Sequence, residues 1–191
     1  PLDAATRPVR PGMSGGRYNP LSDAEVQRIH QTALQALEEI GLADAPESGV
    51  AILTGAGAVL GDDGRIRFPR ALVEDMLAKA ARNITLFGRD PAHDLEVTGT
   101  RVYYGSAGAA VHVVDVQGRN YRESTVQDLF DAARIVDRLD NIHFLQRPMV
   151  CRDIPDNLAM DLNTIYACCR GTTKHVGTSF TEPAFVPHAF D

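Results

Sequence analysis

The alternation of helical and strand patterns between Ser124 and Phe180 is the feature that most constrains the fold of this chain. The segment "STVQDLFDAARIVDRLD" has helical apolar spacing, and "NIHFLQRPMV" has the pattern of a strand. "DNLAMDLNTIYACCRG" is helical again, and "KHVGTSF" is a second strand. This order and spacing are typical of βαβ units, in which neighbouring strands run parallel. This part of the chain is therefore predicted to be α/β.

Local signals mark the ends of these two helices. Ser124 and Gln127 are predicted to form a capping box at the start of the first helix. Asp153 and Asp156 are expected to start the second helix, and Gly171 is expected to end it. The apolar stripe of the first helix is predicted to consist of Val126, Leu129, Ala133, Val136 and Leu139.

The earlier part of the chain is predicted to be α+β material. Residues 1–20, rich in proline and glycine, are expected to form an extended arm. A helix is predicted in "LSDAEVQRIHQTALQALEEIG", with a capping box of Ser22 and Glu25. Its apolar stripe is predicted to consist of Val26, Ile29, Ala33, Leu37 and Ile40.

Shorter elements are expected to follow this helix. Residues 50–68 are predicted to form a small hairpin-like segment in which "GDDG" supplies the turn. A further helix follows Pro69, with a predicted buried stripe of Leu72, Val73, Met76, Leu77 and Ala80. Short antiparallel strands are predicted in "NITLFGRD", "HDLEV", "RVYYG" and "AVHVVDVQGRNYRE", the last with a turn at "DVQGR".

Charge, hydropathy and cysteine content limit the class of protein. The formal net charge is −6 and no Lys/Arg cluster occurs, so no nucleic-acid partner is expected. No apolar run approaches the ~20 residues of a membrane span, and the N-terminus lacks the apolar core of a secretory signal. Cys151, Cys168 and Cys169 have no C-x-x-C spacing and are expected to be reduced thiols. These features predict a cytoplasmic protein without a membrane partner.

Polar side chains follow both strands of the predicted parallel pair. Thr178 to Glu182 come after the second strand, and Gln146 to Met149 end the first. In parallel α/β proteins the functional site lies beyond the carboxyl ends of the strands. Two βα units do not enclose a pocket, so these polar residues are expected to face a cavity that needs further walls.

Six blocks of the sequence resemble, in order, the N-terminal part of the trimethylamine:corrinoid methyltransferase family. They are "GGRYNPLSDAEVQRIHQTALQALEEIG", "FPRALVEDMLAKA", "LFGRDPAHDL", "VYYGSAGAAVHVVDVQGR", "STVQDLFDAARIVDRLDNIHF" and "GTTKHVGTSF". The resemblance implies a (βα)8 TIM-type barrel preceded by an N-terminal α+β extension. Residues 1–100 would then form the arm, helices and short strands, and residues 101–191 the first units of an incomplete barrel.

The resemblance also implies a reaction. Family members transfer a methyl group from a methylated amine, such as trimethylamine or glycine betaine, to the cob(I)alamin of a separate corrinoid protein. That partner carries the corrinoid, so this chain is expected to bind no cofactor tightly. Trimethylamine enzymes carry a pyrrolysine later in the barrel, whereas members without it resemble betaine demethylases. That position lies beyond Asp191, so the amine stays open, with a betaine-type member as one alternative.

No familiar catalytic motif is needed for such a transfer, and no catalytic residue is assigned. Cob(I)alamin supplies the nucleophile, and a quaternary ammonium leaves as a neutral amine without a general acid. What the protein must supply is binding of the cation, alignment of one N–CH3 bond and exclusion of water.

Four residues are the candidates for substrate binding. Tyr104 offers an aromatic wall for the cation, and Glu182 a carboxylate that faces it. Arg147 would bind the carboxylate of a betaine, and Thr178 would donate a hydrogen bond. The ordinary alternatives are a half-buried strand aromatic for Tyr104, a surface ion pair for Arg147 and a backbone cap for Thr178.

Two other functional interpretations stay open. The chain alone would be a non-catalytic scaffold or docking piece if the full barrel or an oligomer is needed. A zinc-dependent barrel enzyme would draw its ligands from His112, His143, His175 and Cys151, but no H-x-H or H-x-x-x-H spacing occurs, so no metal is expected. The open sheet edges and apolar helix faces of a partial barrel predict self-association into a homo-oligomer.

Overall fold

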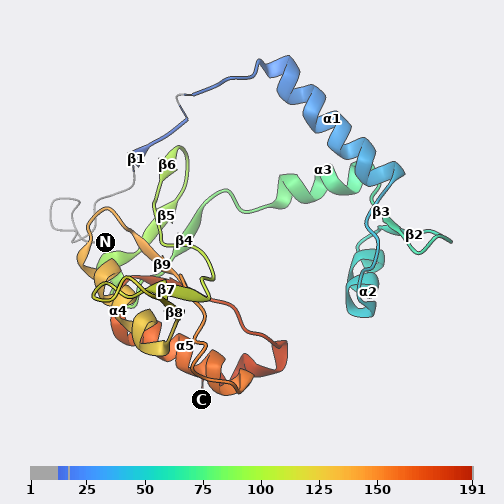
Figure 1. Cartoon of the computed structure of the whole chain (residues 1–191). Helices are drawn as coiled ribbons and strands as arrows, with labels where there is room; N and C mark the ends of the chain where they lie inside the picture. The colour runs from blue at the N-terminus through green and yellow to red at the C-terminus, as the bar shows by residue number, and fades with distance from the viewer. Residues whose placement is uncertain (1–12, 17, 191) are drawn as a thin grey trace. The chain divides into compact units, whose positions relative to one another are not determined.

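The structure, a computed structural model, describes residues 13–16 and 18–190 of the chain (Figure 1). Its contacts divide the chain into two compact units, and each is described by itself. One unit contains Gly16–Arg82, and the other combines the residues up to Gly15 with those from Asn83 onward. Most of the arm predicted for residues 1–20 lies outside the described residues. The predicted division after residue 100 stays a prediction.

The unit from Gly16 to Arg82 contains three helices and one short hairpin. Its elements are α1 (Asp23–Glu39), α2 (Glu47–Gly55), β2 (Val59–Leu60), β3 (Ile66–Arg67) and α3 (Arg70–Lys79). The predicted capping box is confirmed, because the hydroxyl of Ser22 accepts from Glu25 N while the carboxylate of Glu25 accepts from Ser22 N at 2.8 Å. The "GDDG" turn is also confirmed between antiparallel β2 and β3. Ile66 is fully buried, and Leu34 and Ala58 are the other buried apolar residues among the described residues of this unit.

Two predictions for this unit are wrong. The first part of residues 50–68 belongs to helix α2 and not to a hairpin, because a short apolar run such as "VAILT" fits either structure and periodicity does not separate them. The stripe predicted to be buried in α3 is not, since α3 has no buried residue, and the buried residue of α1 is Leu34, which is outside the apolar stripe predicted for that helix. Ile29 is 57% exposed and Met76 46% exposed. Helical spacing thus predicted where these helices lie in the sequence, but not which of their residues are buried.

The second unit begins with short antiparallel strand pairs, as predicted. Strand β1 (Met13–Ser14) pairs with β6 (Arg101–Val102), β4 (Ile84–Leu86) with β5 (Leu95–Val97), and β7 (His112–Val114) with β8 (Tyr121–Glu123). The "DVQGR" turn joins β7 to β8, and Arg119 N donates to Asp115 O at 2.8 Å. A short 3-10 helix, η1 (Pro91–His93), lies between β4 and β5.

The predicted helix–strand–helix–strand series follows, and its two strands are parallel. Its elements are α4 (Val126–Arg138), β9 (Phe144–Gln146), α5 (Asn157–Gly171) and β10 (His175–Gly177), followed by the 3-10 helices η2 (Pro183–Phe185) and η3 (Pro187–Ala189). β9 and β10 pair in parallel, with His175 opposite Phe144. On the other side of β9, isolated parallel bridges join Gly105 to Phe144 and Ala110 to Met149. The described residues are therefore mixed α/β with small sheets, and they form no closed barrel.

The core of this unit lies between the parallel strands and helices α4 and α5, which lie side by side (Figure 1). Its buried members are Leu129, Ala133, Val136, Leu145, Cys151, Ala167 and Cys168. The three middle residues of the stripe predicted for α4 are among them, whereas Leu139 is 47% exposed. All three cysteines are free, and burial raises the pKa of Cys168 to about 12, so this thiol stays protonated at neutral pH.

The capping box of α4 lies one residue later than predicted. Thr125, and not Ser124, is the N-cap, and its partner is Asp128 instead of Gln127. The guanidinium of Arg122 binds both carboxylate oxygens of Asp128, at 2.6 and 2.7 Å, and holds the pKa of that carboxyl well below its ordinary value. Ser124 is fully buried, and its hydroxyl donates to Val150 O at 2.7 Å. Ser and Thr are both good N-caps, so the tertiary contact of Ser124 decided between them.

A buried lysine joins the end of α4 to the start of β9. Lys174 is 1% exposed, and its Nζ donates to the carbonyl oxygens of Val136 at 2.7 Å, Leu139 at 2.8 Å and Ile142 at 2.7 Å. A cation at the C-terminus of a helix is also favoured by the helix dipole. Burial lowers the pKa of Lys174 from its ordinary value, while the carboxylates of Asp137 and Asp140 oppose that shift.

The residues just before Lys174 hold the same helix end. Asp137 Oδ1 accepts from Thr173 N at 2.8 Å and from Thr172 Oγ1 at 2.9 Å. Burial acts to raise the pKa of Asp137, but these hydrogen bonds outweigh it and lower the pKa from its ordinary value. The Thr173 hydroxyl also lies 2.8 Å from Nδ1 of His93. The "TTK" segment is therefore a structural clamp at the amino end of β10.

No helix among the described residues is both long enough and apolar enough to cross a membrane.

Replacing Lys174 with methionine is expected to lower the free energy of unfolding by about 2–4 kcal/mol, because buried carbonyl oxygens lose their donor. Urea unfolding followed by circular dichroism, with hydrogen exchange of the amides in α4 and β9, measures this loss. Lys79→Met is the matched control, since Lys79, the other lysine of the sequence, is exposed at the end of α3. Equal stability of the two variants would show that the Lys174 clamp contributes little.

Candidate functional site

The carboxyl ends of β9 and β10 bring two of the four predicted substrate-binding residues to one edge. Gly177 is opposite Gln146 in the register, and Arg147 N donates to Gly177 O at 2.8 Å. Arg147 and Thr178 are the residues that follow β9 and β10, and they therefore lie level with each other. Glu182 is exposed at the start of η2, in the segment that follows β10.

Tyr104 lies at the other end of the strand pair. Its carbonyl oxygen accepts from His143 N at 2.7 Å, and its own N–H donates to Nδ1 of His143 at 3.0 Å. This level precedes the bridge between Gly105 and Phe144, at the amino end of β9. The structure thus does not bring Tyr104 to the edge that carries Arg147, and a role of Tyr104 in substrate binding stays a prediction.

A buried carboxylate holds the segment that follows β10. Asp161 of α5 is 2% exposed, and its Oδ2 accepts from Thr181 N at 2.7 Å and from Thr181 Oγ1 at 2.8 Å. Its Oδ1 and the hydroxyl of Thr178 are both buried, and neither has a hydrogen-bond partner within the described part of the chain. This edge therefore retains hydrogen-bonding capacity that a further group can satisfy.

Asp161 was missed by the sequence reasoning, although a signal for it exists. The buried residues of α5 are Asp161, Thr164, Ala167, Cys168 and Gly171, which follow helical spacing. A carboxylate at the start of such a buried stripe indicates a specific partner, because an unpaired buried charge is costly.

Side-chain alternation places Gln146 on the face of β9 opposite Leu145. Leu145 and Val176 pack in the core formed with the helices, so Gln146 and Gly177 lie on the opposite face of the two strands. The charge of Arg147, the residue after β9, acts to lower the pKa of Cys151, which burial raises. From the sequence, Gln146 was placed in the polar segment Gln146 to Met149 but given no binding role, although period-two alternation from the apolar Leu145 would have placed it on the other face.

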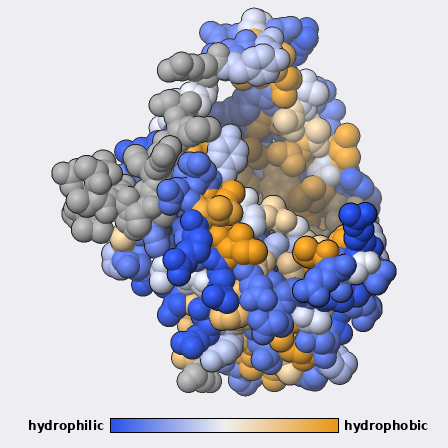
Figure 2. All heavy atoms as spheres, turned by 60° about the vertical axis from the view of Figure 1, so that its left-hand side comes forward, coloured by the Kyte–Doolittle hydropathy of each residue, from blue (hydrophilic) through white to orange (hydrophobic). Residues whose placement is uncertain are grey.

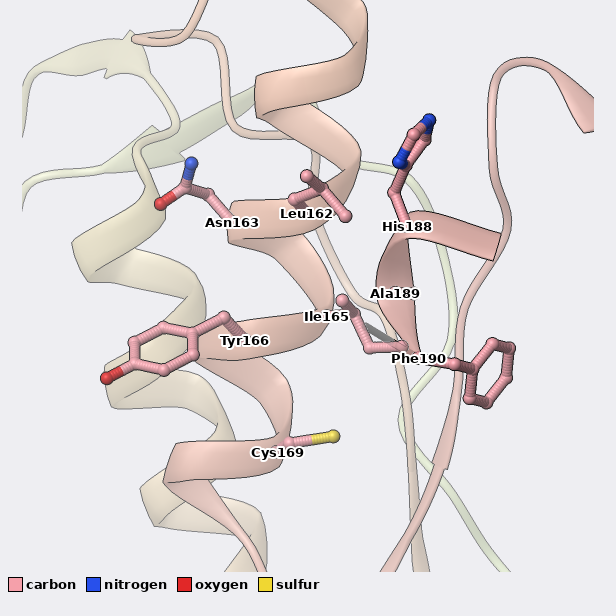
Figure 3. A pocket seen from close by; sticks show the side chains of 8 residues that line it. All are labelled: Leu162, Asn163, Ile165, Tyr166, Cys169, His188, Ala189 and Phe190. Atoms are coloured by element: carbon pink, nitrogen blue, oxygen red, sulfur yellow. The ribbon is translucent and has the colours of Figure 1, made fainter. Parts of the chain in front are cut away.

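One described cavity is lined by α5 and η3 and by no residue of β9 or β10. It has a volume of about 580 Å³ and lies between η3 and a face of α5 other than the buried one. Figure 3 shows Leu162, Ile165 and Cys169 directed toward η3, which contributes His188 and Ala189. Its mainly apolar lining suits packing against another apolar group.

The histidines proposed for the zinc alternative have other contacts. Among the described residues, no group of three or more His, Cys, Asp or Glu side chains is placed to hold a metal ion. His175 Nδ1 lies 2.8 Å from Phe87 O, and the ring of His143 packs edge-on to Tyr103 at 5.3 Å. Cys151 Sγ lies 3.5 Å from Thr164 Oγ1.

Comparison with known proteins adds independent information. The family model described as trimethylamine methyltransferase (MTTB) matches residues 4–190. The chain is 30% identical over 156 residues to trimethylamine methyltransferase MttB of Desulfitobacterium hafniense (strain DSM 10664 / DCB-2), covering 81% of this chain and 31% of that protein. It is 26% identical over 159 residues to the glycine betaine methyltransferase of Desulfitobacterium hafniense (strain Y51), covering 83% and 33%.

A third relative is trimethylamine methyltransferase MttB1 of Methanosarcina mazei, 25% identical over 167 residues, with 85% of this chain and 34% of that protein covered. The chain thus spans about a third of the length of the curated relatives it matches.

Replacing Asp161 with alanine is expected to release the segment after β10 from α5, since Thr181 loses an acceptor for both its amide and its hydroxyl. The expected cost is about 2–4 kcal/mol in the free energy of unfolding, with faster hydrogen exchange of the Thr181 amide. Asp131→Ala, on the exposed side of α4, is the control and is expected to change stability by less than about 0.5 kcal/mol. Unchanged hydrogen exchange of the Thr181 amide in Asp161→Ala would show that Asp161 does not hold the segment after β10.

Proposed function

Because the chain belongs to the trimethylamine methyltransferase family, we propose that it forms the first part of an enzyme that transfers a methyl group from a methylated amine to the cob(I)alamin of a separate corrinoid protein. Trimethylamine and a quaternary amine such as glycine betaine are the substrate candidates, since relatives named for both match it at similar identity. The proposed location is the cytoplasm.

The observation that carries this proposal is the parallel pair of β9 and β10 with polar residues at its carboxyl edge. Parallel strands with helices on one face are the repeating unit of a (βα)8 barrel, and the additional parallel bridges along β9 fit a third neighbouring strand. We propose that the chain contributes these first units and that the remaining strands complete the ring. The functional edge of such a barrel is the one that carries Arg147 and Thr178.

The residues of this chain have a binding and orienting task in the proposed reaction. Cob(I)alamin supplies the attacking electron pair. The departing nitrogen of a quaternary amine keeps the electrons of the broken N–CH3 bond and leaves uncharged, so no proton donor is needed. Glu182 is proposed to attract the cation, Arg147 to bind a substrate carboxylate and Thr178 to donate a hydrogen bond. Tyr104 is proposed as an aromatic contact, from a strand level nearer the amino end.

A second candidate function is that of a scaffold or docking piece. It is supported by the cavity beside α5, whose lining contains no residue of the carboxyl edge of the strands. Exposed apolar side chains also suit association with further protein, and Figure 2 shows hydrophobic residues at the surface among polar ones. Tyr166 is 65% exposed and Ile135 60% exposed. Self-association into a homo-oligomer is part of this proposal.

Methyl transfer distinguishes the two candidates. The intact protein that contains this chain is expected to methylate cob(I)alamin on a purified corrinoid protein from trimethylamine or glycine betaine, monitored by the visible spectrum of the corrinoid. The 191-residue chain alone is expected to be inactive, because two βα units leave the substrate exposed to water. Turnover by the chain alone would refute the scaffold function, and inactivity of the intact protein with both amines would refute the methyltransferase.

Replacing Glu182 with glutamine in the intact protein is expected to raise KM for both amines about tenfold, because a carboxylate near the cation is lost while the shape is kept. Steady-state kinetics of methyl transfer measure the change. Glu47→Gln, in the exposed first turn of α2, is the matched control and is expected to leave KM unaltered. A KM of Glu182→Gln equal to that of the control would remove Glu182 from the binding site.

A further inference from the structure

Two side chains of β9 lean across glycines of the neighbouring strand segments. A Cβ atom added to Gly177 would overlap Oε1 of Gln146 and lie 3.1 Å from its Cδ. A Cβ atom added to Gly105 would overlap the ring of Phe144. Gly177 and Gly105 are the direct partners of these two residues in the parallel register. The long side chains thus lie along the sheet, over positions where the neighbouring strand has no side chain.

Glycine is required at these two positions because a Cβ atom would overlap a neighbouring side chain, and not because of the backbone conformation. Neither Gly105 nor Gly177 has a positive φ, so other residues could adopt the same backbone. The obstacle at Gly177 is the amide of Gln146. That amide occupies a defined place at the carboxyl edge because Gly177 leaves room for it.

The backbone of Gln146 is fixed, while its side-chain amide has free hydrogen-bonding groups. Its carbonyl oxygen accepts from Ser106 Oγ at 2.7 Å, and its strand position is set by pairing with Gly177. The residue is only partly buried, and within residues 13–16 and 18–190 its amide makes no hydrogen bond to protein. Nε2 lies farther than Oε1 from the Gly177 Cβ position, at 3.6 Å, so the donor end is less closely packed against β10.

This combination is typical of a group that orients a ligand. The amide lies over Gly177, on the face opposite the helical core, at the edge where parallel sheets bind substrates. We infer that Gln146 is a specificity-determining residue that donates from Nε2 to the carboxylate of a betaine-type amine, and that Gly177 is the positioning residue that leaves space for it. The inference rests on the proposed function and names its substrate class: a quaternary amine that carries a carboxylate.

Binding of three amines distinguishes recognition of the substrate carboxylate by Gln146 from a general disturbance of the site. Glycine betaine has both the cation and the carboxylate, whereas tetramethylammonium and trimethylamine have no carboxylate. In the intact protein, Gln146→Leu is expected to raise the Kd for glycine betaine at least tenfold in calorimetry and its KM by a similar factor, with kcat changed less than threefold. The values for the other two amines are expected to stay within twofold of wild type.

Two further variants control the experiment. Gln127→Leu makes the same chemical change on the exposed surface of α4 and is expected to bind glycine betaine like wild type. Gly177→Ala keeps the Gln146 side chain but displaces its amide, and is expected to reproduce the selective loss. Circular dichroism melts of each variant identify any that are unfolded.

The outcomes for the inference and for the proposed function differ. An active intact protein in which Gln146→Leu binds glycine betaine as tightly as Gln127→Leu does overturns the inference alone. An equal loss for all three amines in a folded Gln146→Leu variant also overturns it, since the carboxylate is then not the group recognised. Wild-type protein that does not bind glycine betaine overturns the inference as well, whereas absence of transfer from all three amines refutes the proposed function.

Discussion

The three hydrogen bonds from Nζ of Lys174 are the interaction on which the parallel part of the structure depends. They satisfy carbonyl oxygens at the end of α4 and at the approach to β9, from a residue that immediately precedes β10. A single side chain therefore fixes one helix and both strands relative to one another. Burial of its charge is costly, and the hydrogen bonds with the adjacent helix end compensate for that cost.

The two ends of the strand pair have different tasks. The amino end is closed by the "TTK" segment, where Asp137 and Lys174 have several partners each. At the carboxyl end, three polar groups have no hydrogen-bond partner among the described residues: Oδ1 of Asp161, the hydroxyl of Thr178 and the amide of Gln146. The polar groups are thus hydrogen-bonded at the amino end and partly without partners at the carboxyl end. Parallel α/β enzymes have this arrangement, with stabilising contacts at the amino ends of the strands and the reaction at the carboxyl ends.

In this part of the chain, sequence patterns predicted the helices and strands more accurately than the contacts between segments. The helical spacing of α4 and α5 and the parallel pairing of β9 and β10 were predicted because two helices and two strands alternate over short connections. Four site candidates were also chosen from the sequence, and the structure brings Arg147 and Thr178 to one edge but places Tyr104 at the other end. Strand register decides this, and register depends on contacts between segments far apart in the sequence.

By itself, the sequence determined the positions of most helices and strands and the ordered blocks that resemble one family, because local periodicity and capping are encoded by neighbouring residues. Tertiary structure alone decided that Leu34 is buried instead of Ile29, that Thr125 caps α4, and that Asp161 and Lys174 are structural clamps. It also decided that Gln146 lies over Gly177. The physical reason is that burial and hydrogen bonding of these groups depend on partners distant in the chain, which no local pattern specifies.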